Sequence, residues 1–227
     1  NAQNSTTTPR TLEVDSRFRN LQRGIFTRGN FDVNIHDCDQ FRDIDGEAIS
    51  INSMNYDRSI TIINNLQFQR NNIGIRVSGG RLNSVTISNN HFDNSGFVET
   101  SNAAFHNTAI TVQKWSSHLG IPVTGVAEIF NNGILNHRIG IHAINIENVR
   151  IGGYDGSTSR PNIISYNLSN SALSETFHGI WIQNCNKADI LANDIENNDP
   201  TTETNLRGIV VENSDNANIG CNNIGQM

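Results

Sequence analysis

The sequence predicts an all-β protein, a right-handed three-sided parallel β-helix of about seven coils. Three observations predict this fold: a stretch of sequence repeats along the chain, isoleucine alternates with polar residues, and asparagine recurs between the apolar pairs. β-Branched side chains favour the half-buried surface of a short strand, and asparagine favours tight corners. The chain has 36 asparagines among its 227 residues, and those that recur in the repeat are expected to form corners between short strands.

The repeat is clearest in its last two copies, GIWIQNCNKADILANDI (Gly179–Ile195) and GIVVENSDNANIGCNNI (Gly208–Ile224), which align without a gap. Earlier copies begin at Gly24, Ala48, Gly74, Ala109 and Gly140. Self-similarity at a short, irregular period is typical of a solenoid. Because the repeat runs along nearly the whole chain, we expect a single β-helix domain at 24–227.

The two ends of this solenoid are expected to differ. Residues 1–23 contain four apolar residues between positions 12 and 21 and are expected to form a partial first coil or a cap. The last copy of the repeat ends at Ile224, three residues before the end of the sequence. An open solenoid end exposes apolar core and unpaired strand edges. We therefore expect further β-helix coils or a partner subunit to cover the C-terminal face.

Within each copy, the apolar pair that follows the glycine or alanine is expected to point inward, as for Ile75 with Val77 and Ile180 with Ile182. Coils of a β-helix stack about 4.8 Å apart, so that equivalent residues form columns. Stacked asparagines can bond from coil to coil through their side-chain amides. One such ladder is expected from Asn90, Asn132, Asn162, Asn193 and Asn222, and a second from Asn145, Asn184 and Asn213.

Two stretches resemble a known group of proteins. SVTISNNHFDNS (Ser84–Ser95) looks like the strand-turn-strand unit of right-handed parallel β-helix proteins of the pectate-lyase-like superfamily. IGG followed by NIIS, within Ile151–Ser165, is similar to the repeats of periplasmic and secreted β-helix proteins of the copper-site assembly type. The resemblance covers Gly24–Ile224 and implies the fold. It does not imply one activity, because the superfamily includes lyases, glycosidases, phage tailspikes, adhesins and structural spacers.

Composition limits the partners and the location of the protein. A net charge of −6 and a pI near 5.6 argue against a nucleic-acid-binding protein, which would carry clustered Lys and Arg. No apolar run is long enough for a membrane-spanning helix, so no membrane insertion is expected. The resemblance implies a secreted, periplasmic or cell-surface location. Cys38, Cys185 and Cys221 show no metal-binding spacing and are expected to be packing residues, with a pairing between distant coils as the alternative.

Candidate binding residues come from insertions and from outward-facing columns. Of five insertions, four are expected to flank the sheet that is built from the Gly-Ile strands, where the resemblance places a substrate groove. The outward residues of that sheet include Arg76, His142, Trp181, Gln183 and Glu212, with His178 just before its strand. Trp181 beside His142 and His178 is expected to give a flat aromatic face on which sugar rings stack. The alternative is a tryptophan covered by the loop between Leu168 and Phe177.

Further candidates lie outside this face. Trp115, on an insertion near His118, is a second aromatic candidate. A histidine metal site lacks a third ligand, and no metal ligand is assigned. Calcium remains an option through four acidic residues, which lie in a segment without calcium-loop spacing. These four are Asp37, Asp39, Asp43 and Asp45.

Two functional hypotheses follow. The first is a non-catalytic β-helix module of a secreted or cell-surface protein, which acts as a rigid scaffold, an adhesin or a carbohydrate-binding surface. The alternative is a polysaccharide lyase or glycosidase that acts in the groove along the Gly-Ile sheet. Glycosidases use a pair of carboxylates, whereas the outward columns supply only Glu212. No catalytic residue is therefore assigned.

Overall fold

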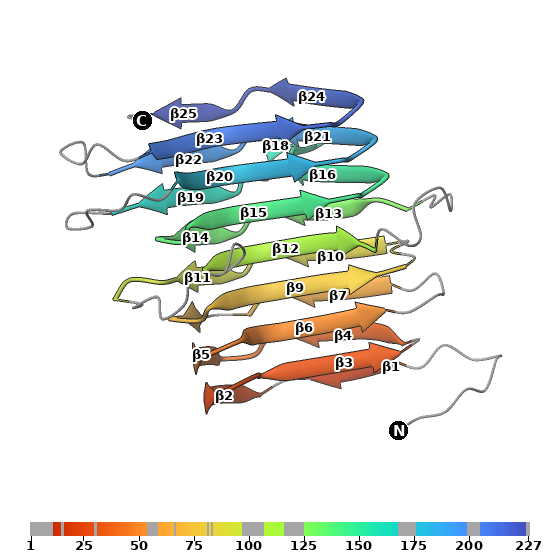
Figure 1. The fold of residues 1–227 in the computed structure, drawn as a ribbon, viewed down its shortest axis with the longest axis vertical. Helices are drawn as coiled ribbons and strands as arrows, with labels where there is room; N and C mark the ends of the chain where they lie inside the picture. Colours follow the sequence, from red (N-terminus) through yellow and green to blue (C-terminus); the bar gives the residue numbers. More distant parts are fainter. Residues whose placement is uncertain are drawn as a thin grey trace.

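The structure is a computed structural model of the chain. It describes residues 11–14, 16–29, 31–53, 59–65, 67–80, 82, 84–96, 107–115, 125–167, 176–198 and 205–225. Within these residues there is no helix, and the strands form three long parallel sheets that wind into a solenoid (Figure 1). The predicted three-sided parallel β-helix is confirmed.

The strands form three sheets, which we name A, B and C; each of the first seven coils contributes one strand to each sheet, and the described part of the last coil contributes to sheets A and B. Sheet A contains β1 (Thr11–Val14), β4 (Asp32–His36), β7 (Ser59–Ile63), β10 (Ser84–Ser88), β13 (Ala127–Phe130), β16 (Asn148–Gly152), β21 (Lys187–Leu191) and β24 (Asn216–Gly220). Sheet B contains β2 (Arg17–Leu21), β5 (Gln40–Ile44), β8 (Phe68–Gln69), β11 (His91–Asp93), β14 (Gly133–Leu135), β19 (Ile163–Tyr166), β22 (Asp194–Asn197) and β25 (Asn223–Gly225). Sheet C contains β3 (Ile25–Gly29), β6 (Glu47–Ser53), β9 (Ile73–Gly79), β12 (Thr108–Lys114), β15 (Ile139–Ile144), β20 (Thr176–Gln183) and β23 (Asn205–Glu212).

We number the coils by their sheet A strands, from coil 1 with β1 to coil 8 with β24. The seven strands of sheet C correspond to the seven copies of the sequence repeat. β1 and β2 pair in parallel with β4 and β5, so the chain before the first copy builds two strands of coil 1. A small antiparallel hairpin, β17 (Tyr154–Asp155) with β18 (Thr158–Ser159), interrupts coil 6 between sheets A and B.

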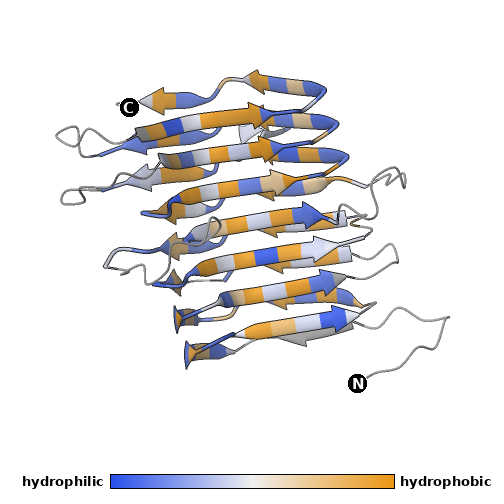
Figure 2. Ribbon diagram, in the orientation of Figure 1, coloured by the Kyte–Doolittle hydropathy of each residue, from blue (hydrophilic) through white to orange (hydrophobic). Residues whose placement is uncertain are grey.

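The core of the solenoid is filled by columns of equivalent residues. Apolar and polar residues alternate along the strands (Figure 2), and the inward isoleucines are almost completely buried. In coils 1–4 the inward column of sheet B consists of stacked phenylalanines with ring centroids 4.5–5.0 Å apart: Phe18, Phe41, Phe68 and Phe92. From coil 5 onward isoleucine takes this position. The spacing of the rings follows from the rise between hydrogen-bonded strands.

Close packing between coils explains the glycine at the start of several copies of the repeat. A Cβ atom added at Gly140 would lie 2.5 Å from the carbonyl oxygen of Gly179, and one added at Gly179 would lie 2.6 Å from the carbonyl oxygen of Gly208. The backbones of successive coils therefore approach closely where sheet C begins, and these positions have no room for a Cβ atom. This contact explains why these copies of the repeat begin with glycine.

The first predicted asparagine ladder is confirmed at the corner between sheets A and B. Each side-chain amide donates to the side-chain oxygen of the asparagine in the next coil, over 2.9–3.1 Å. The ladder consists of Asn65, Asn90, Asn132, Asn162, Asn193 and Asn222, one more than the sequence predicted. Cys38 holds the equivalent position in coil 2, where its backbone N–H donates to Asn65 Oδ1.

The second predicted ladder is only partly formed. Asn145, Asn184 and Asn213 all have left-handed backbone, with φ between 49° and 58°, as expected of asparagine corners. Asn184 Nδ2 donates to Asn145 Oδ1 over 3.2 Å, but among the described residues no side-chain bond joins Asn213 to Asn184. Asn145 Nδ2 donates instead to the backbone oxygen of Lys114 over 3.1 Å, and the side chains of Asn184 and Asn213 are exposed to solvent.

Three further features bear on the sequence predictions. Cys38 and Cys185 are buried, Cys221 is exposed, and no disulfide joins these three cysteines. No helix in the described part of the chain is long and apolar enough to cross a membrane. The inward residues Ile219 and Ile224 of coil 8 are exposed by 51% and 41%. Coverage of this face by further coils or a partner subunit stays a prediction.

Candidate functional site

The outward face of sheet C carries three columns of side chains, and we call it the sheet C face. Strand register aligns Phe26, Ser50, Arg76, Thr111, His142, Trp181 and Val210 in one column. It aligns Arg28, Asn52, Ser78, Gln113, Ile144, Gln183 and Glu212 in the next. The register confirms both predicted columns.

The third column of this face was not predicted from the sequence. Its members are Glu47, Ile73, Thr108, Ile139, His178 and Arg207. Each member directly precedes the glycine or alanine that opens a copy of the repeat. This constant place in the repeat could have identified the column from the sequence.

Three of the predicted residues form a stack of rings. The His142 and Trp181 ring centroids lie 4.5 Å apart with planes inclined by 5°, and the His178 and Trp181 centroids lie 4.6 Å apart with planes inclined by 27°. We call these three residues the ring stack. The two imidazoles cover part of the indole surface on which a sugar ring would stack. The flat face that the sequence predicted at Trp181 is thus partly covered by two of its neighbours on the sheet. The loop that was the alternative cover lies, at 168–175, outside the described residues.

A hydrogen-bonded chain holds the ring stack in place. Gln183 Nε2 donates to Glu212 Oε2 over 2.8 Å, and Gln183 Oε1 lies 2.8 Å from His142 Nε2. Because the glutamine oxygen can only accept, the proton of His142 must lie on Nε2. Glu212 thereby fixes the amide of Gln183, and the amide fixes the tautomer of His142.

Burial and charge set the protonation of this cluster. Burial lowers the pKa of His142 to about 4, and it also lowers the pKa of His178, to which Arg207 adds a smaller effect. The hydrogen bond from Gln183 lowers the pKa of Glu212. Trp181 Nε1 is buried and has no partner within hydrogen-bonding geometry, yet it lies close enough to Glu212 to favour the carboxylate. At neutral pH the cluster is therefore two neutral imidazoles beside one carboxylate.

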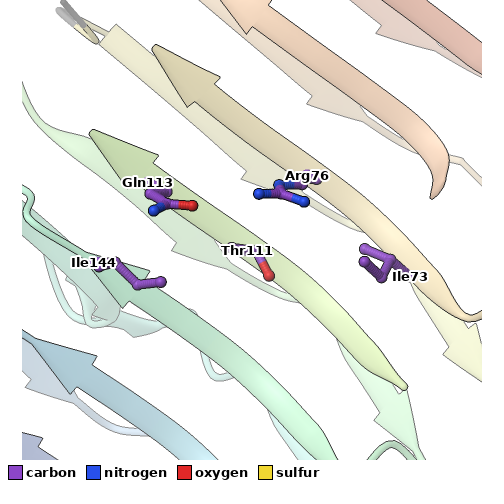
Figure 3. Close-up of a pocket in the computed structure, with 5 residues that line it drawn as sticks. All are labelled: Ile73, Arg76, Thr111, Gln113 and Ile144. Atoms are coloured by element: carbon purple, nitrogen blue, oxygen red, sulfur yellow. The ribbon is translucent and has the colours of Figure 1, made fainter. Parts of the chain in front are cut away.

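A shallow pocket of about 130 Å³ lies next to the ring stack on the same face. Figure 3 shows the polar ends of Arg76, Thr111 and Gln113 gathered on one side of the sheet, with Ile73 and Ile144 flanking them. These five residues come from β9, β12 and β15, and we call their site the Arg76 pocket. Neighbouring coils thus bring a guanidinium, a hydroxyl and an amide together.

The guanidinium of Arg76 is only weakly engaged within the protein. Its Nη1 lies 3.8 Å from Glu47 Oε1, and its side chain is 40% exposed. Glu47 has a closer partner, because Arg23 Nε donates to Glu47 Oε2 over 2.9 Å. Most of the hydrogen-bonding capacity of Arg76 is therefore available to a ligand.

The carboxylates of the sheet C face are widely separated. In the described part of this face they are Glu47 in coil 2 and Glu212 in coil 7. Five coil steps of about 4.8 Å place them roughly 24 Å apart, whereas the two carboxylates of a glycosidase lie about 5–9.5 Å apart. These two residues cannot form such a pair.

The remaining predicted candidates lie elsewhere. Trp115 directly follows β12, at the corner where sheet C ends in coil 4, and its backbone N–H donates to Gly79. His118 lies outside the described residues. Asp39 pairs with Arg17 over 2.6 Å, and Asp43 accepts two bonds from Arg70 over 2.7 and 2.9 Å. Across the described residues no group of three His, Cys, Asp or Glu side chains could hold a metal ion.

Comparisons with protein-family models, with curated proteins and with solved structures found no match for this chain. The class of the protein therefore rests on its own fold: a three-sided parallel β-helix with an internal asparagine ladder. The function rests on the chemistry of the sheet C face.

Proposed function

We propose that the chain is a non-catalytic β-helix module of a secreted, periplasmic or cell-surface protein, and that its sheet C face binds carbohydrate. The observation that carries the proposal is the Arg76 pocket. A weakly paired guanidinium offers planar donors that suit a carboxylate or sulfate group. Thr111 and Gln113 can bond sugar hydroxyls, and Ile73 with Ile144 offers apolar contact to the ring.

The pocket accommodates one group of a larger ligand. Its volume of about 130 Å³ is well below the roughly 300–1,000 Å³ of a site that encloses a whole small molecule. A polysaccharide would therefore insert one substituent beside Arg76 and lie over the rest of the sheet C face. A relationship to the pectate-lyase-like superfamily belongs to the same proposal, because in that superfamily the groove runs along this sheet.

The test is a binding screen against neutral, carboxylated and sulfated polysaccharides, in which depolymerisation is followed in the same samples. We expect a carboxylated or sulfated polymer to bind. Arg76→Ala should weaken its binding about 10- to 100-fold, because a hydrogen bond to a charged group contributes about 1.5–3 kcal/mol. Arg19→Ala removes an exposed arginine of sheet B, outside the sheet C face, and should leave binding unchanged.

The outcomes separate the two functional hypotheses. Equal binding by the Arg76→Ala variant and the unaltered protein would show that the pocket is not the site. Release of new reducing or unsaturated ends from the bound polymer would favour the alternative, a lyase or glycosidase, and would end the proposal of a non-catalytic module. Binding without chain cleavage supports the proposal.

A further inference from the structure

The sequence contains a single Asn-Gly pair, Asn132–Gly133, and the fold places it at the corner between sheets A and B in coil 5. Asn-Gly is chemically labile in a flexible chain because glycine has no Cβ to hinder attack by its backbone nitrogen. That nitrogen attacks Cγ of the asparagine side chain, the Cγ–Nδ2 bond breaks, and ammonia leaves with the proton of the backbone N–H. Water then opens the succinimide at either carbonyl and gives aspartate or isoaspartate.

In the folded chain the side chain of Asn132 is fixed on both ends. It is 1% exposed. Its Nδ2 donates to the backbone oxygens of Ile87 and Phe130 and to Asn162 Oδ1, each over 3.0 Å. Its Oδ1 accepts from the backbone N–H and the side-chain amide of Asn90, each over 3.1 Å. The side chain cannot turn Cγ toward the backbone without breaking these bonds.

The attacking nitrogen is held as well. The backbone N–H of Gly133 donates to the carbonyl oxygen of Asn90 over 2.9 Å. Attack on Cγ would require this bond to break at the same time as those of the ladder. Because both the nucleophile and its target are bound to coil 4, the reaction has to wait for coils 4 and 5 to separate.

The product of the reaction is incompatible with the ladder. An aspartate at position 132 is an acceptor only when ionised. Its carboxylate would face three acceptor oxygens, those of Ile87, Phe130 and Asn162, in a place with almost no access to water. An unpaired buried charge of this kind is strongly destabilising. Isoaspartate adds one atom to the main chain at a tight corner and is worse.

We propose that Asn132 is a deamidation site that is closed in the folded β-helix and open in the unfolded chain. Deamidation there removes the ability to refold. The longer the chain stays unfolded, the larger the fraction of molecules that is permanently deamidated at Asn132. The hydrogen bonds of the folded ladder protect Asn132 from deamidation.

The first experiment compares the folded and unfolded protein at the same mildly alkaline pH and temperature. Samples are held with and without denaturant for increasing times, refolded by dilution, and separated into folded and aggregated fractions. Peptide mass mapping then measures deamidation at Asn132. We expect the unfolded chain to deamidate more than about tenfold faster than the folded one, because deamidation of Asn132 in the folded protein requires the coils to separate first. The refolded fraction should contain almost no deamidated Asn132. Equal rates in both states, or deamidated chains in the refolded fraction, would overturn the proposal.

Two sets of variants sharpen the test. Gly133→Ala should slow deamidation in the unfolded chain, because a methyl group now hinders the attacking nitrogen. It should still fold, because the added Cβ meets only the side chain of His91, at 2.9 Å. Asn132→Asp should fail to refold, whereas Asn198→Asp, at an exposed asparagine outside the ladder, should refold like the unaltered protein. An Asn132→Asp variant with unchanged thermal stability would refute the proposal.

Discussion

Asn162 Nδ2 donates to Asn193 Oδ1 over 2.9 Å, and Asn193 Nδ2 in turn donates to Asn222 Oδ1 over 3.0 Å. Each amide of the ladder is thus both a donor and an acceptor in the direction of the solenoid axis. The same amides also donate to backbone carbonyls of their own coil, as Asn193 Nδ2 does to the carbonyl oxygen of Leu191 over 3.2 Å. The ladder therefore stabilises the corner within a coil as well as the stacking between coils.

Removal of one ladder amide should destabilise the whole solenoid. Asn193→Ala leaves the buried carbonyl of Ile151 and the backbone N–H of Asn162 without their partners. The expected loss is about 1–3 kcal/mol of unfolding free energy, measured by chemical denaturation. Asn198→Ala, at an exposed loop asparagine, is the matched control and should be nearly silent. Similar losses for the two variants would contradict a structural role for the ladder.

The corner residue before the ladder offers a stabilising substitution. Ala192 has a left-handed backbone with φ of 55°, at a place where other coils carry asparagine. Relief of left-handed strain by glycine is worth about 1–2 kcal/mol, and the greater freedom of the unfolded glycine chain offsets about 0.5–1 kcal/mol of it. Ala192→Gly should therefore raise the unfolding free energy slightly. Ala188→Gly, at a buried strand position without positive φ, should lower it. A shift of the same sign in both variants would show that backbone strain does not decide the result.

His137 should make the fold sensitive to acid. Its ring is fully buried against Phe92, both ring nitrogens lack hydrogen-bond partners, and burial lowers its pKa to about 3, against the opposing effect of Asp93. The unfolded chain takes up a proton below about pH 6.5 and the folded chain does not, so stability that is present above pH 6.5 is lost as the pH falls toward 3.

The magnitude can be measured by denaturation at two pH values. Between pH 6.5 and 5, His137 should lower the free energy of unfolding by about 2 kcal/mol. This follows from 1.36 kcal/mol per pH unit for one proton that only the unfolded chain binds. His137→Leu should remove this part of the pH dependence while other groups keep theirs. If both proteins lose the same stability between the two pH values, His137 does not titrate as its burial implies.

Trp181 should control the protonation of its neighbour. Burial is the main cause of the low pKa of His142, near 4, and Trp181 covers one face of its ring. Trp181→Ala admits water to that face, and the pKa of His142 should rise toward 6.5, as followed by NMR titration of its ring protons. The far-ultraviolet circular dichroism should not change. Trp115→Ala, at the corner that follows β12, should leave the pKa of His142 unchanged. An unchanged pKa in the Trp181→Ala variant would mean that the sheet itself, and not the indole, excludes water.

The coil and its columns could be predicted from the repeat alone. The equivalence of Asn132, Asn193 and Asn222 could be predicted because hydrogen bonds between parallel strands fix the spacing of coils. Residues with the same place in the repeat must then stack, whatever their surroundings. The same rule predicted that Arg76, Thr111 and His142 lie in one column on one face.

The arrangement of the surface side chains of neighbouring coils could not be predicted from the sequence and is seen in the folded chain. Side-chain rotamers decide that His142 stacks on Trp181 and that Arg23 bonds Glu47. They thereby also decide that Arg76 is only weakly paired with Glu47. Several rotamers are open to each of these residues, and contacts with adjacent coils select among them. A repeating backbone therefore makes the position of a residue predictable from sequence, whereas its partners depend on which neighbours the adjacent coils supply.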